Sequence, residues 1–507
     1  MIAKASSVAL VGMDGHPVDV EVAVASGLPV FTIVGLPDPS IQEARERVRS
    51  AITASRETWP MQRVTVNLSP AHLRKTGSAF DLAMALGVLV ATGTIEQRRL
   101  EGLCLLGELS LDGTVRGVRG VLPATVAAAG EGARAVVVPR VNAREAALVS
   151  AVEVLPVEHL TQAVGFLRGT VRVDPYDGPV ASAEEISADD DLSDVRGQAQ
   201  AKRALEVAAA GGHNLLMVGS PGAGKTMLAR RLAGILPPMS EAEAFEVTRI
   251  YSVAGLLPSD RPLVTRRPFR APHHSGSMTG LIGGGSGVPH PGEASLAHRG
   301  VLFLDEFAEF RREALDALRQ PLEDGCVTIV RSRWAVTYPA RFQLIAASNP
   351  CACGHRDDGR KPCVCSSVRR SSYMERLEGP VIDRIDLQVP VARLSKEDLF
   401  GVPEGDSTAI VAERVAEARA RQRARLRNSP ATCNAELPPK NLEEAIGLQP
   451  RGRAIIEQAV EKHALSARGA HRILRVARTV ADLEGRDVVT HEHVGEALQF
   501  RVAEARE

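Results

Sequence analysis

The sequence predicts an α/β protein with a central parallel sheet and an all-helical C-terminal part. Between about residues 193 and 393, the apolar runs NLLMVG, GVLFLDE and FQLIAAS are bounded by Gly, Asn or Pro and separated by helical stretches. Buried parallel strands joined by helices have this pattern. After Arg393 such runs disappear, and segments such as GAHRILRVARTVADLEG repeat their apolar residues with a helical period. We therefore expect a helical lid domain over residues 394–507.

The first part of the chain, residues 1–172, is predicted to be a second α/β unit. VDVEVAVASG and RVTVNLSP alternate apolar with polar residues as strands do, whereas SIQEARERVRSAITAS and FDLAMALGVLVATG have helical periods. Residues 173–192 are rich in Asp, Glu, Ser and Pro and are expected to form an acidic linker. The central sheet domain would then span residues 193–393, and a chain of 507 residues is long enough for about three domains.

The composition is that of a globular protein, with 44% apolar and 24% charged residues. Lys plus Arg equals Asp plus Glu at 61 each, so the net charge gives no general reason to bind nucleic acid or an anionic membrane. The first residues lack the apolar core of a signal peptide, and no segment approaches the roughly 20 apolar residues of a membrane span. We expect a cytoplasmic protein without a membrane partner.

A glycine-rich segment after the first strand of the predicted central sheet indicates nucleotide binding. Its sequence GSPGAGKT fits the pattern G-x-x-x-x-G-K-[ST], and a helix-compatible run follows it directly. Glycines let backbone N–H groups turn toward phosphate oxygens, while the lysine neutralises phosphate charge and the threonine hydroxyl binds Mg²⁺. The residues predicted to bind ATP and Mg²⁺ are Gly219, Ser220, Pro221, Gly222, Ala223, Gly224, Lys225 and Thr226.

Two acidic residues end the next apolar strand, in GVLFLDEF. Asp305 would hold Mg²⁺ through water, and Glu306 would act as general base for the attacking water. An apolar run followed by Asp-Glu is common at strand ends, but after a phosphate-binding loop it favours a catalytic pair. The combination predicts ATP hydrolysis.

Further polar residues follow in an order that fits the same site. Asn349 ends the strand FQLIAAS and is suited to orient the attacking water, although an Asn at a strand end can equally be a turn residue. Arg384, in the loop GPVIDRIDLQV, is a candidate arginine finger. Arg472 and Arg475 lie one helical turn apart and would project from the helical domain onto bound nucleotide. Taken singly, each arginine has the alternative of a surface salt bridge.

Four of the seven cysteines fall within fifteen residues, which favours a metal cluster over disulfides. The two C-x-C pairs would bind Zn²⁺ tetrahedrally and close residues 351–365 into a small knuckle. Because C-x-C pairs are less typical of zinc than C-x-x-C, four reduced thiols in a loop are the alternative. In APHHSG, His273 and His274 are interpreted as loop hydrogen-bonding residues. The candidate zinc ligands are Cys351, Cys353, Cys363 and Cys365.

The order of these motifs and several longer strings resemble a known family. RAPHHSGSMTGLIGGGSGVPHPGEASLAHRGVLFLDE, QPLEDGCVTIVR, ASNPCACG and RILRVARTVADLEG closely resemble the YifB/ComM family, a magnesium-chelatase-like branch of the AAA+ ATPases. The resemblance covers nearly the whole chain. It implies a Walker A motif that includes Lys225 and Thr226 and a Walker B motif at Asp305 and Glu306.

The same resemblance implies roles for the remaining polar residues. Asn349 would be sensor one, and Arg475 together with Arg472 would be sensor two. Arg384 would be a finger that acts on a neighbouring subunit, which implies a ring, expected to be a homo-hexamer.

The N-terminal part resembles the Lon-protease-like fold, notably in KTGSAFDLAMALGVL and GLCLLGELSLDGTVRGVRGVLPATVAAA. Peptide hydrolysis in that fold needs a Ser nucleophile and a Lys base. Aligned on these strings, the two positions hold Ala79 and Arg119, and a guanidinium does not act as a neutral base. We therefore expect a proteolytically inactive domain that serves assembly or DNA contact.

The family resemblance implies an ATP-dependent ring motor that acts on single-stranded or branched DNA. Helicase or branch-migration activity in recombination or natural transformation is the expected function. Arginines at residues 261–270, 331–333 and 419–427 are compatible with phosphate contacts, although the last group has the alternative of a solvated helix face. The alternative function is a chelatase-like ATPase that remodels a protein partner. An ATP-dependent protease is disfavoured by the missing Ser and Lys.

Overall fold

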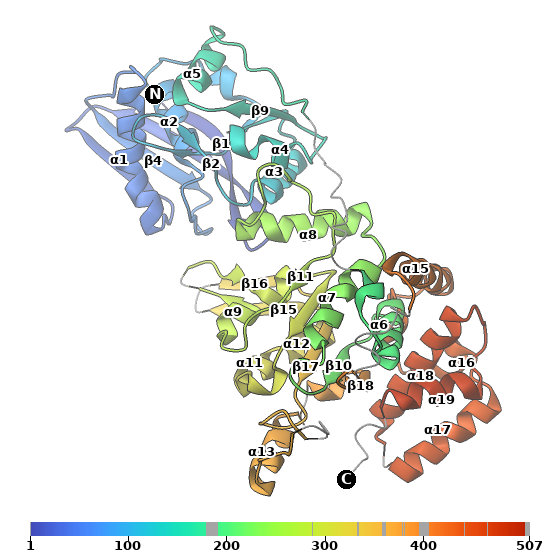
Figure 1. Ribbon diagram of the computed structural model, residues 1–507. Helices are drawn as coiled ribbons and strands as arrows, with labels where there is room; N and C mark the ends of the chain where they lie inside the picture. The colour runs from blue at the N-terminus through green and yellow to red at the C-terminus, as the bar shows by residue number, and fades with distance from the viewer. Residues whose placement is uncertain are drawn as a thin grey trace.

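The computed structural model of this chain describes residues 2–178, 191–285, 287–331, 334–356, 361–377, 379, 381–394, 405–440, 442–463 and 465–501. Most of the predicted acidic linker lies outside these residues, as do residues 395–404 of the predicted helical domain. The described residues form an N-terminal region built on one sheet, a central region built on a second sheet, and a helical C-terminal region (Figure 1).

The N-terminal region is built on a mixed seven-stranded sheet in the order β3-β4-β2-β1-β5-β8-β9. Its long strands β1 and β2 pair antiparallel, and α2, whose residues are all buried, packs on both of them. The strands are β1 (Ile2–Val11), β2 (Asp14–Ala25), β3 (Val30–Val34), β4 (Arg63–Ser69), β5 (Leu103–Leu105), β8 (Ala135–Pro139) and β9 (Glu153–Val157), with a small hairpin β6 (Glu108–Leu109) and β7 (Val115–Arg116). The helices are α1 (Pro39–Ala54), α2 (Asp81–Ala91), α3 (Val121–Gly130), α4 (Ala143–Ala146) and α5 (Leu160–Arg168). The two strands and two helices predicted here from the sequence are confirmed as β2, β4, α1 and α2.

The central sheet is entirely parallel, in the order β11-β14-β17-β10-β18. The predicted apolar runs are confirmed as β10, β14 and β17, which are buried strands. Since all five strands run the same way, the segments that follow their carboxyl ends meet at one edge of the sheet. The strands are β10 (Leu215–Val218), β11 (Phe269–Arg270), β14 (Val301–Leu304), β17 (Gln343–Ser348) and β18 (Leu387–Pro390).

Helices and two hairpins surround this sheet. The hairpin strands are β12 (Gly283–Gly284) with β13 (His290–Pro291) and β15 (Cys326–Arg331) with β16 (Trp334–Pro339). The hydroxyl of Tyr338 on β16 donates to the carbonyl of Pro289 at 2.7 Å, which joins the two hairpins. The helices are α6 (Ala199–Gly211), α7 (Lys225–Ile235), α8 (Glu241–Ala254), α9 (Met278–Ile282), α10 (Glu293–Leu296), α11 (Arg312–Ala317), α12 (Arg319–Asp324) and α13 (Ser367–Leu377).

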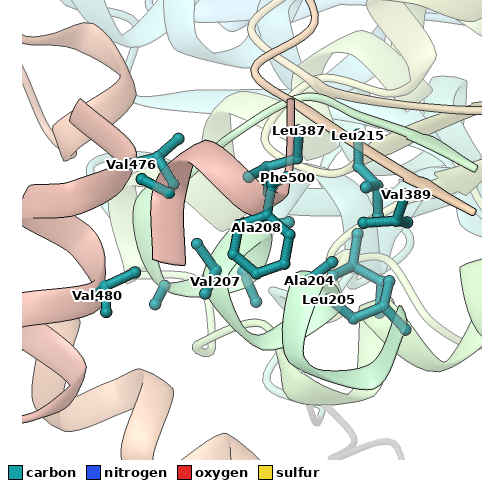
Figure 2. Packing of buried hydrophobic residues seen from close by; sticks show 14 of the residues in the cluster. Ala204, Leu205, Val207, Ala208, Leu215, Leu387, Val389, Val476, Val480 and Phe500 are labelled. Atoms are coloured by element: carbon teal, nitrogen blue, oxygen red, sulfur yellow. The ribbon is translucent and has the colours of Figure 1, made fainter. Parts of the chain in front are cut away.

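The C-terminal region is helical, as predicted, and packs on the central sheet through α6. Figure 2 shows apolar side chains of α6, β10, β18 and α18 meeting in one cluster with Phe500. Burying these groups together removes apolar surface from water and holds the helical region against the sheet. Its helices are α15 (Thr408–Arg425), α16 (Leu442–Ile446), α17 (Pro450–His463), α18 (Ala467–Leu483) and α19 (His491–Gln499).

Helix α8 lies between the N-terminal region and the central sheet (Figure 1). The backbone N–H of Gly120 donates to the carbonyl of Ser252 at 3.0 Å, and Arg249 donates to the carbonyl of Met13 at 2.9 Å. The Ser252 hydroxyl also donates to the buried carboxylate of Glu145. These contacts attach the N-terminal region to α8. Among the described residues, no helix has the length and apolar character needed to cross a membrane.

Candidate nucleotide-binding site

The segment from Gly219 to Gly224 forms a tight loop between β10 and α7. Gly222 and Gly224 have φ values of 78° and 93°, a left-handed conformation that a residue with a Cβ adopts only with strain. Because α7 begins at Lys225, its N-terminal N–H groups face the loop and favour an anion there. The loop borders a cavity of about 470 Å³. The cavity is lined by Pro221, Gly222, Ala223, Gly224, Lys225, Thr226, Met227, Asp305, Glu306, Ser348 and Asn349.

Strand register explains why these distant residues meet. Val218 of β10 pairs with Ser348 of β17, so the glycine-rich loop and Asn349 start side by side. β14 lies on the other side of β17, with Leu304 opposite Ala346, and Asp305 follows at the same edge. The predicted strand carrying Asp-Glu therefore does not neighbour β10 directly. β17 lies between them.

The two predicted magnesium ligands are in direct contact. The hydroxyl of Thr226 donates to Oδ2 of Asp305 at 2.7 Å. A hydroxyl and a carboxylate oxygen are ligands that Mg²⁺ prefers, and Mg²⁺ usually keeps several waters as well. The pair therefore fits a Mg²⁺ ion held partly by Thr226 and, directly or through water, by Asp305.

Lys225 lies deep in the site, with 9% of its surface exposed. Its ammonium donates to the carbonyls of Gly219 and Ser220 at 2.5 and 3.1 Å and to Oδ1 of Asn349 at 3.2 Å. Burial lowers the pKa of Lys225, and the carboxylate of Asp305 acts in the opposite direction. The arrangement places a partly desolvated positive charge where phosphate oxygens would compensate it.

Glu306 has a partner that the sequence interpretation did not assign. His274 Nδ1 lies 2.8 Å from Glu306 Oε2. Glu306 also has a φ of 52°, a left-handed conformation that is unusual and strained for a glutamate. His274 follows the edge strand β11, which pairs in parallel with β14, so its loop reaches the residue that follows β14. Because β11 is only two residues long, no apolar run in the sequence revealed this neighbour.

Arg384 lies at the amino ends of the central strands, at the end of the sheet opposite to the glycine-rich loop. Its carbonyl accepts from Nδ2 of Asn214, the residue before β10, at 2.9 Å, and its guanidinium pairs with Glu323. Strands of four to six residues at about 3.3 Å per residue put this end about 13 to 20 Å from the glycine-rich loop. Arg384 lines a second, larger cavity of about 1510 Å³ between the sheet and the helical region.

Arg472 and Arg475 line the same large cavity and not the cavity beside the glycine-rich loop, and their contact with bound nucleotide stays a prediction. Arg472 lies 3.8 Å from the carboxylate of Asp386 and donates to the carbonyl of Ile385 at 3.5 Å, at the amino end of β18. The reason is the packing of α18 against α6, which the helical period alone does not specify. Burial lowers the pKa of Arg472 to about 10.

Comparison with known proteins fits this geometry. Family models match residues 191–399 ("Magnesium chelatase, subunit ChlI"), 20–142 ("Subunit ChlI of Mg-chelatase") and 405–501 ("Magnesium chelatase, subunit ChlI C-terminal"). An uncharacterized protein of Mycobacterium tuberculosis is 48% identical over 100% of this chain and 99% of its own length. YifB of Escherichia coli is 42% identical over 97% of this chain and 96% of its own. The competence protein ComM of Haemophilus influenzae is 43% identical over the same shares.

This chain belongs to the YifB/ComM family of magnesium-chelatase-like proteins. Its all-parallel central sheet and helical C-terminal region fit the AAA+ architecture of that family, and membership indicates an ATPase. The Lon-protease-like assignment of the N-terminal region stays a prediction.

In this YifB/ComM-type chain, some arginines of two of the predicted DNA-contacting groups make contacts within the fold. Arg267 donates to the carbonyls of Pro237 and Arg299, and Arg270 pairs with Glu293 at 2.6 Å. In the 419–427 group, Arg419 donates to the carbonyl of Ala209 on α6, and Arg425 pairs with Asp482 on α18 at 2.7 Å. These four side chains are used inside the protein, which corrects their assignment as phosphate contacts. Arg331 remains exposed on β15, whereas Arg333 lies outside the described residues.

The four clustered cysteines are brought together as predicted. Their Sγ atoms all lie within 4.8 Å of one another, with separations of 3.4, 3.7 and 3.6 Å among Cys351, Cys353 and Cys363. Tetrahedral Zn–S bonds of about 2.3 Å would put the sulfurs about 3.8 Å apart. The backbone N–H of His355 lowers the pKa of the Cys353 thiol to about 6, and burial raises that of Cys365 to about 11. The donor set therefore fits a four-thiolate metal site.

The N-terminal residues aligned with the protease positions make other contacts. The carbonyl of Ala79 accepts from the N–H of Gly107 at 2.9 Å, and the Arg119 side chain packs against Gly255 at the end of α8. Ser78, the neighbouring hydroxyl, bonds to the carboxylate of Glu108. The buried ammonium of Lys75 donates to backbone carbonyls, including that of Leu68 at 2.7 Å. The sequence analysis did not single out Lys75, whose ammonium is surrounded by these backbone carbonyls.

Proposed function

We propose that this chain is an ATP-hydrolysing AAA+ motor that works as a homo-hexameric ring on DNA. The observation that carries the ATPase proposal is the 2.7 Å contact between Thr226 and Asp305 beside the buried ammonium of Lys225. Three segments of the sequence supply one small cavity with a lysine, two magnesium-compatible oxygens, a carboxylate and an amide. These are the groups that phosphoryl transfer to water requires.

Each residue has a defined task in the proposed reaction. Lys225 and the N–H groups of the glycine-rich loop bind the phosphates, and Thr226 with Asp305 holds Mg²⁺. Glu306 accepts a proton from the attacking water, and Asn349 orients that water near the γ-phosphate. The exposed Glu306 carboxylate faces the cavity edge and is held by His274.

The large arginine-lined cavity supports a ring. Arg384, Arg472 and Arg475 lie at the edge of the sheet away from the chain's own glycine-rich loop. The Nε of Arg475 is buried without a hydrogen-bond partner among the described residues, which leaves a donor for an incoming anion. We infer that a neighbouring subunit presents its nucleotide phosphates here, with Arg384 as the finger that stabilises the transition state.

Two hairpins support the DNA proposal. Val330 and Arg331, at the end of β15, are exposed, and a guanidinium nitrogen of Arg331 lies close to Gly284 of β12. A positive side chain beside a glycine-rich hairpin suits a phosphate backbone, because glycine allows close approach. The name of the competence protein among the relatives favours a role in natural transformation. Helicase or branch-migration activity on single-stranded or branched DNA is the proposed function.

We also propose a structural Zn²⁺ at the four cysteines. Zinc held this way supplies folding energy without taking part in ATP chemistry. The N-terminal region is proposed to be a Lon-protease-like domain without proteolytic activity, because Ala79 and Arg119 offer neither nucleophile nor neutral base. Its attachment to α8 suits a role in assembly.

A chelatase-like ATPase that remodels a protein partner is the second candidate, and it is favoured by the family models that match three parts of the chain. One experiment separates the two. The ATPase rate of the full chain is measured alone and with forked DNA, a Holliday junction or single-stranded DNA, at about 50 mM and about 200 mM salt. A DNA motor is stimulated by DNA, and the stimulation falls as salt rises. A rate unchanged by every DNA, with no strand displacement, contradicts the DNA proposal and favours the remodelling function.

A further inference from the structure

The segment that carries the four cysteines touches the nucleotide site. We define the cysteine knuckle as residues 351–356 and 361–365. Inside it, the N–H of Gly354 donates to the carbonyl of Cys351 at 2.9 Å and closes a turn. A Cβ added to Gly354 would lie 2.7 Å from Cγ and Cδ of Pro221. The turn therefore packs directly against the glycine-rich loop and leaves no space for a side chain at this position. Gly354 has a φ of 78°, a second reason for glycine at this position.

The knuckle also begins next to a residue of the site. Cys351 follows Asn349 by two positions, and Asn349 Oδ1 accepts from the ammonium of Lys225 at 3.2 Å. Cys351 is buried, with 2% of its surface exposed. The position of the Cys351 thiolate therefore restricts where the amide of Asn349 lies.

The far end of the knuckle leads to a third contact. α13 starts shortly after Cys365, and its Tyr373 hydroxyl lies 3.2 Å from the Ser348 hydroxyl at the end of β17. Arg376 of α13 lies 3.7 Å from Glu309, in the turn that follows Glu306. The knuckle and α13 thus touch the segments after β10, β17 and β14.

Few apolar contacts hold the knuckle itself. Val364 is 80% exposed, and only Ala352 of the described knuckle, apart from its cysteines, packs partly against a buried cluster. A short segment without a core needs a cross-link to keep one conformation. The four thiolates, within 4.8 Å of one another, provide the ligands for that cross-link.

We propose that a Zn²⁺ ion bound by the cysteine knuckle positions the glycine-rich loop and Asn349, so that ATP affinity depends on whether the knuckle holds its metal. This inference rests on the proposed nucleotide site. The metal fixes the turn at Gly354 against Pro221 and fixes Cys351 beside Asn349. Without the metal, ATP binding must order these segments, and that ordering costs free energy.

The direct test measures metal content and nucleotide binding separately. Zinc per chain is determined by elemental analysis, and the Kd of a fluorescent ATP analogue is measured by titration of the full chain. We expect one zinc per chain, lost after chelation or in Cys353→Ser, with a Kd about tenfold higher. Adding ZnCl₂ to the chelated wild-type protein restores the original Kd. Cys326→Ser is the control. It replaces a cysteine outside the knuckle, so we expect it to keep both the zinc and the affinity for the ATP analogue.

A second variant separates the contact from the metal. Gly354→Ala keeps all four thiols, but its Cβ collides with Pro221, so we expect zinc to stay bound while the Kd rises. The thermal unfolding of each variant is measured by circular dichroism, so that a loss of fold is not mistaken for a loss of ATP affinity.

If the wild-type chain binds no zinc, or if zinc leaves and the Kd stays the same, the positioning role is wrong. If Gly354→Ala binds the analogue as tightly as the wild type, the contact with Pro221 has no role. Lys225→Ala serves as a separate control: if it leaves the Kd unchanged, the nucleotide site itself is misassigned, whatever the zinc content.

Discussion

His274 Nδ1 lies 2.8 Å from Oε2 of Glu306, the proposed general base. The contact joins two loops that follow neighbouring strands of the central sheet, β11 and β14. Four residues after His274, α9 begins and leads directly into the hairpin of β12 and β13. Few residues of the chain therefore separate this hairpin from the contact with Glu306, the side chain proposed to activate water.

The first prediction concerns this histidine. In His274→Ala, Glu306 loses its partner and no longer responds to the hairpin, so we expect the ratio of DNA-stimulated to basal ATPase rate to fall severalfold. The Kd for ATP should stay the same, because His274 is not among the residues that line the nucleotide cavity. His72→Ala, which replaces an exposed histidine of the N-terminal region, is the control, because the ring of His273 packs on His274 at 4.1 Å. An unchanged ratio in His274→Ala contradicts the coupling.

The second prediction concerns the base itself. Glu306→Gln keeps the size of the side chain but cannot accept a proton, so we expect kcat to fall by about 10² to 10⁴ while ATP still binds. Turnover is measured by phosphate release and binding by titration. Glu313→Gln, an exposed glutamate on α11, should behave as wild type. Near-normal turnover in Glu306→Gln would move the role of base to another residue.

The third prediction concerns the arginine finger. Arg384→Ala should lower kcat by about 10³ or more while each subunit still binds ATP in its own glycine-rich loop. If the finger acts on a neighbouring subunit, mixing Arg384→Ala chains with Glu306→Gln chains restores part of the activity, because some interfaces then combine an intact Arg384 with an intact Glu306. Arg312→Ala, exposed on α11, is the control. No recovery in the mixture, with mixed rings verified by differential tagging, contradicts action between subunits.

The fourth prediction concerns DNA. Arg331→Ala removes an exposed charge beside the glycine-rich hairpin, so DNA affinity should fall and the slope of log affinity against log salt should decrease by about 1. Arg453→Ala, an exposed arginine of α17 outside the three predicted groups, is the control. Fluorescence anisotropy with a labelled single strand measures both quantities. The same slope in Arg331→Ala and wild type would exclude this arginine from the DNA contact.

The fifth prediction concerns pH and stability. The hydrogen bond from His298 lowers the pKa of Glu246 from 4.5 to about 2. A carboxylate whose pKa is depressed by folding stabilises the protein above its unfolded pKa, and this contribution is lost as the pH falls from about 4.5 toward 2. Glu246→Gln should therefore weaken the decrease of melting temperature over this range. Glu241→Gln, exposed at the start of α8, provides the comparison. Parallel pH curves for Glu246→Gln and wild type would contradict the assignment.

Local sequence patterns were sufficient for the elements that depend on neighbouring residues. The apolar runs before Gly219, Asp305 and Asn349 are buried parallel strands. Such strands can be recognised from a few residues, because a fully buried strand needs no polar face and is therefore a nearly continuous apolar run. The glycine-rich loop was predictable for a similar reason. Gly222 and Gly224 take a left-handed backbone that their residue type allows.

The arginines show where such patterns fail. Arg270, Arg419 and Arg425 belong to groups that suggested phosphate contacts, yet each pairs with a carboxylate or a backbone carbonyl inside the protein. A charged residue in a sequence does not reveal its partner when that partner lies up to 210 residues away. The same holds for His274, whose contact with Glu306 arises from a two-residue edge strand.

The sequence by itself determined which residues are candidates for the proposed chemistry: the glycine-rich loop, the Asp-Glu pair, Asn349 and the four cysteines. Each of these motifs consists of particular residue types, most of them at a short, fixed spacing. Tertiary structure alone decided which of them meet. The parallel order of β14, β17 and β10 brings Thr226 and Asp305 together, whereas the packing of α18 on α6 places Arg472 and Arg475 at the opposite edge. The physical reason is that strand order and helix packing follow from the burial of apolar surface summed over the whole fold, which no short segment encodes.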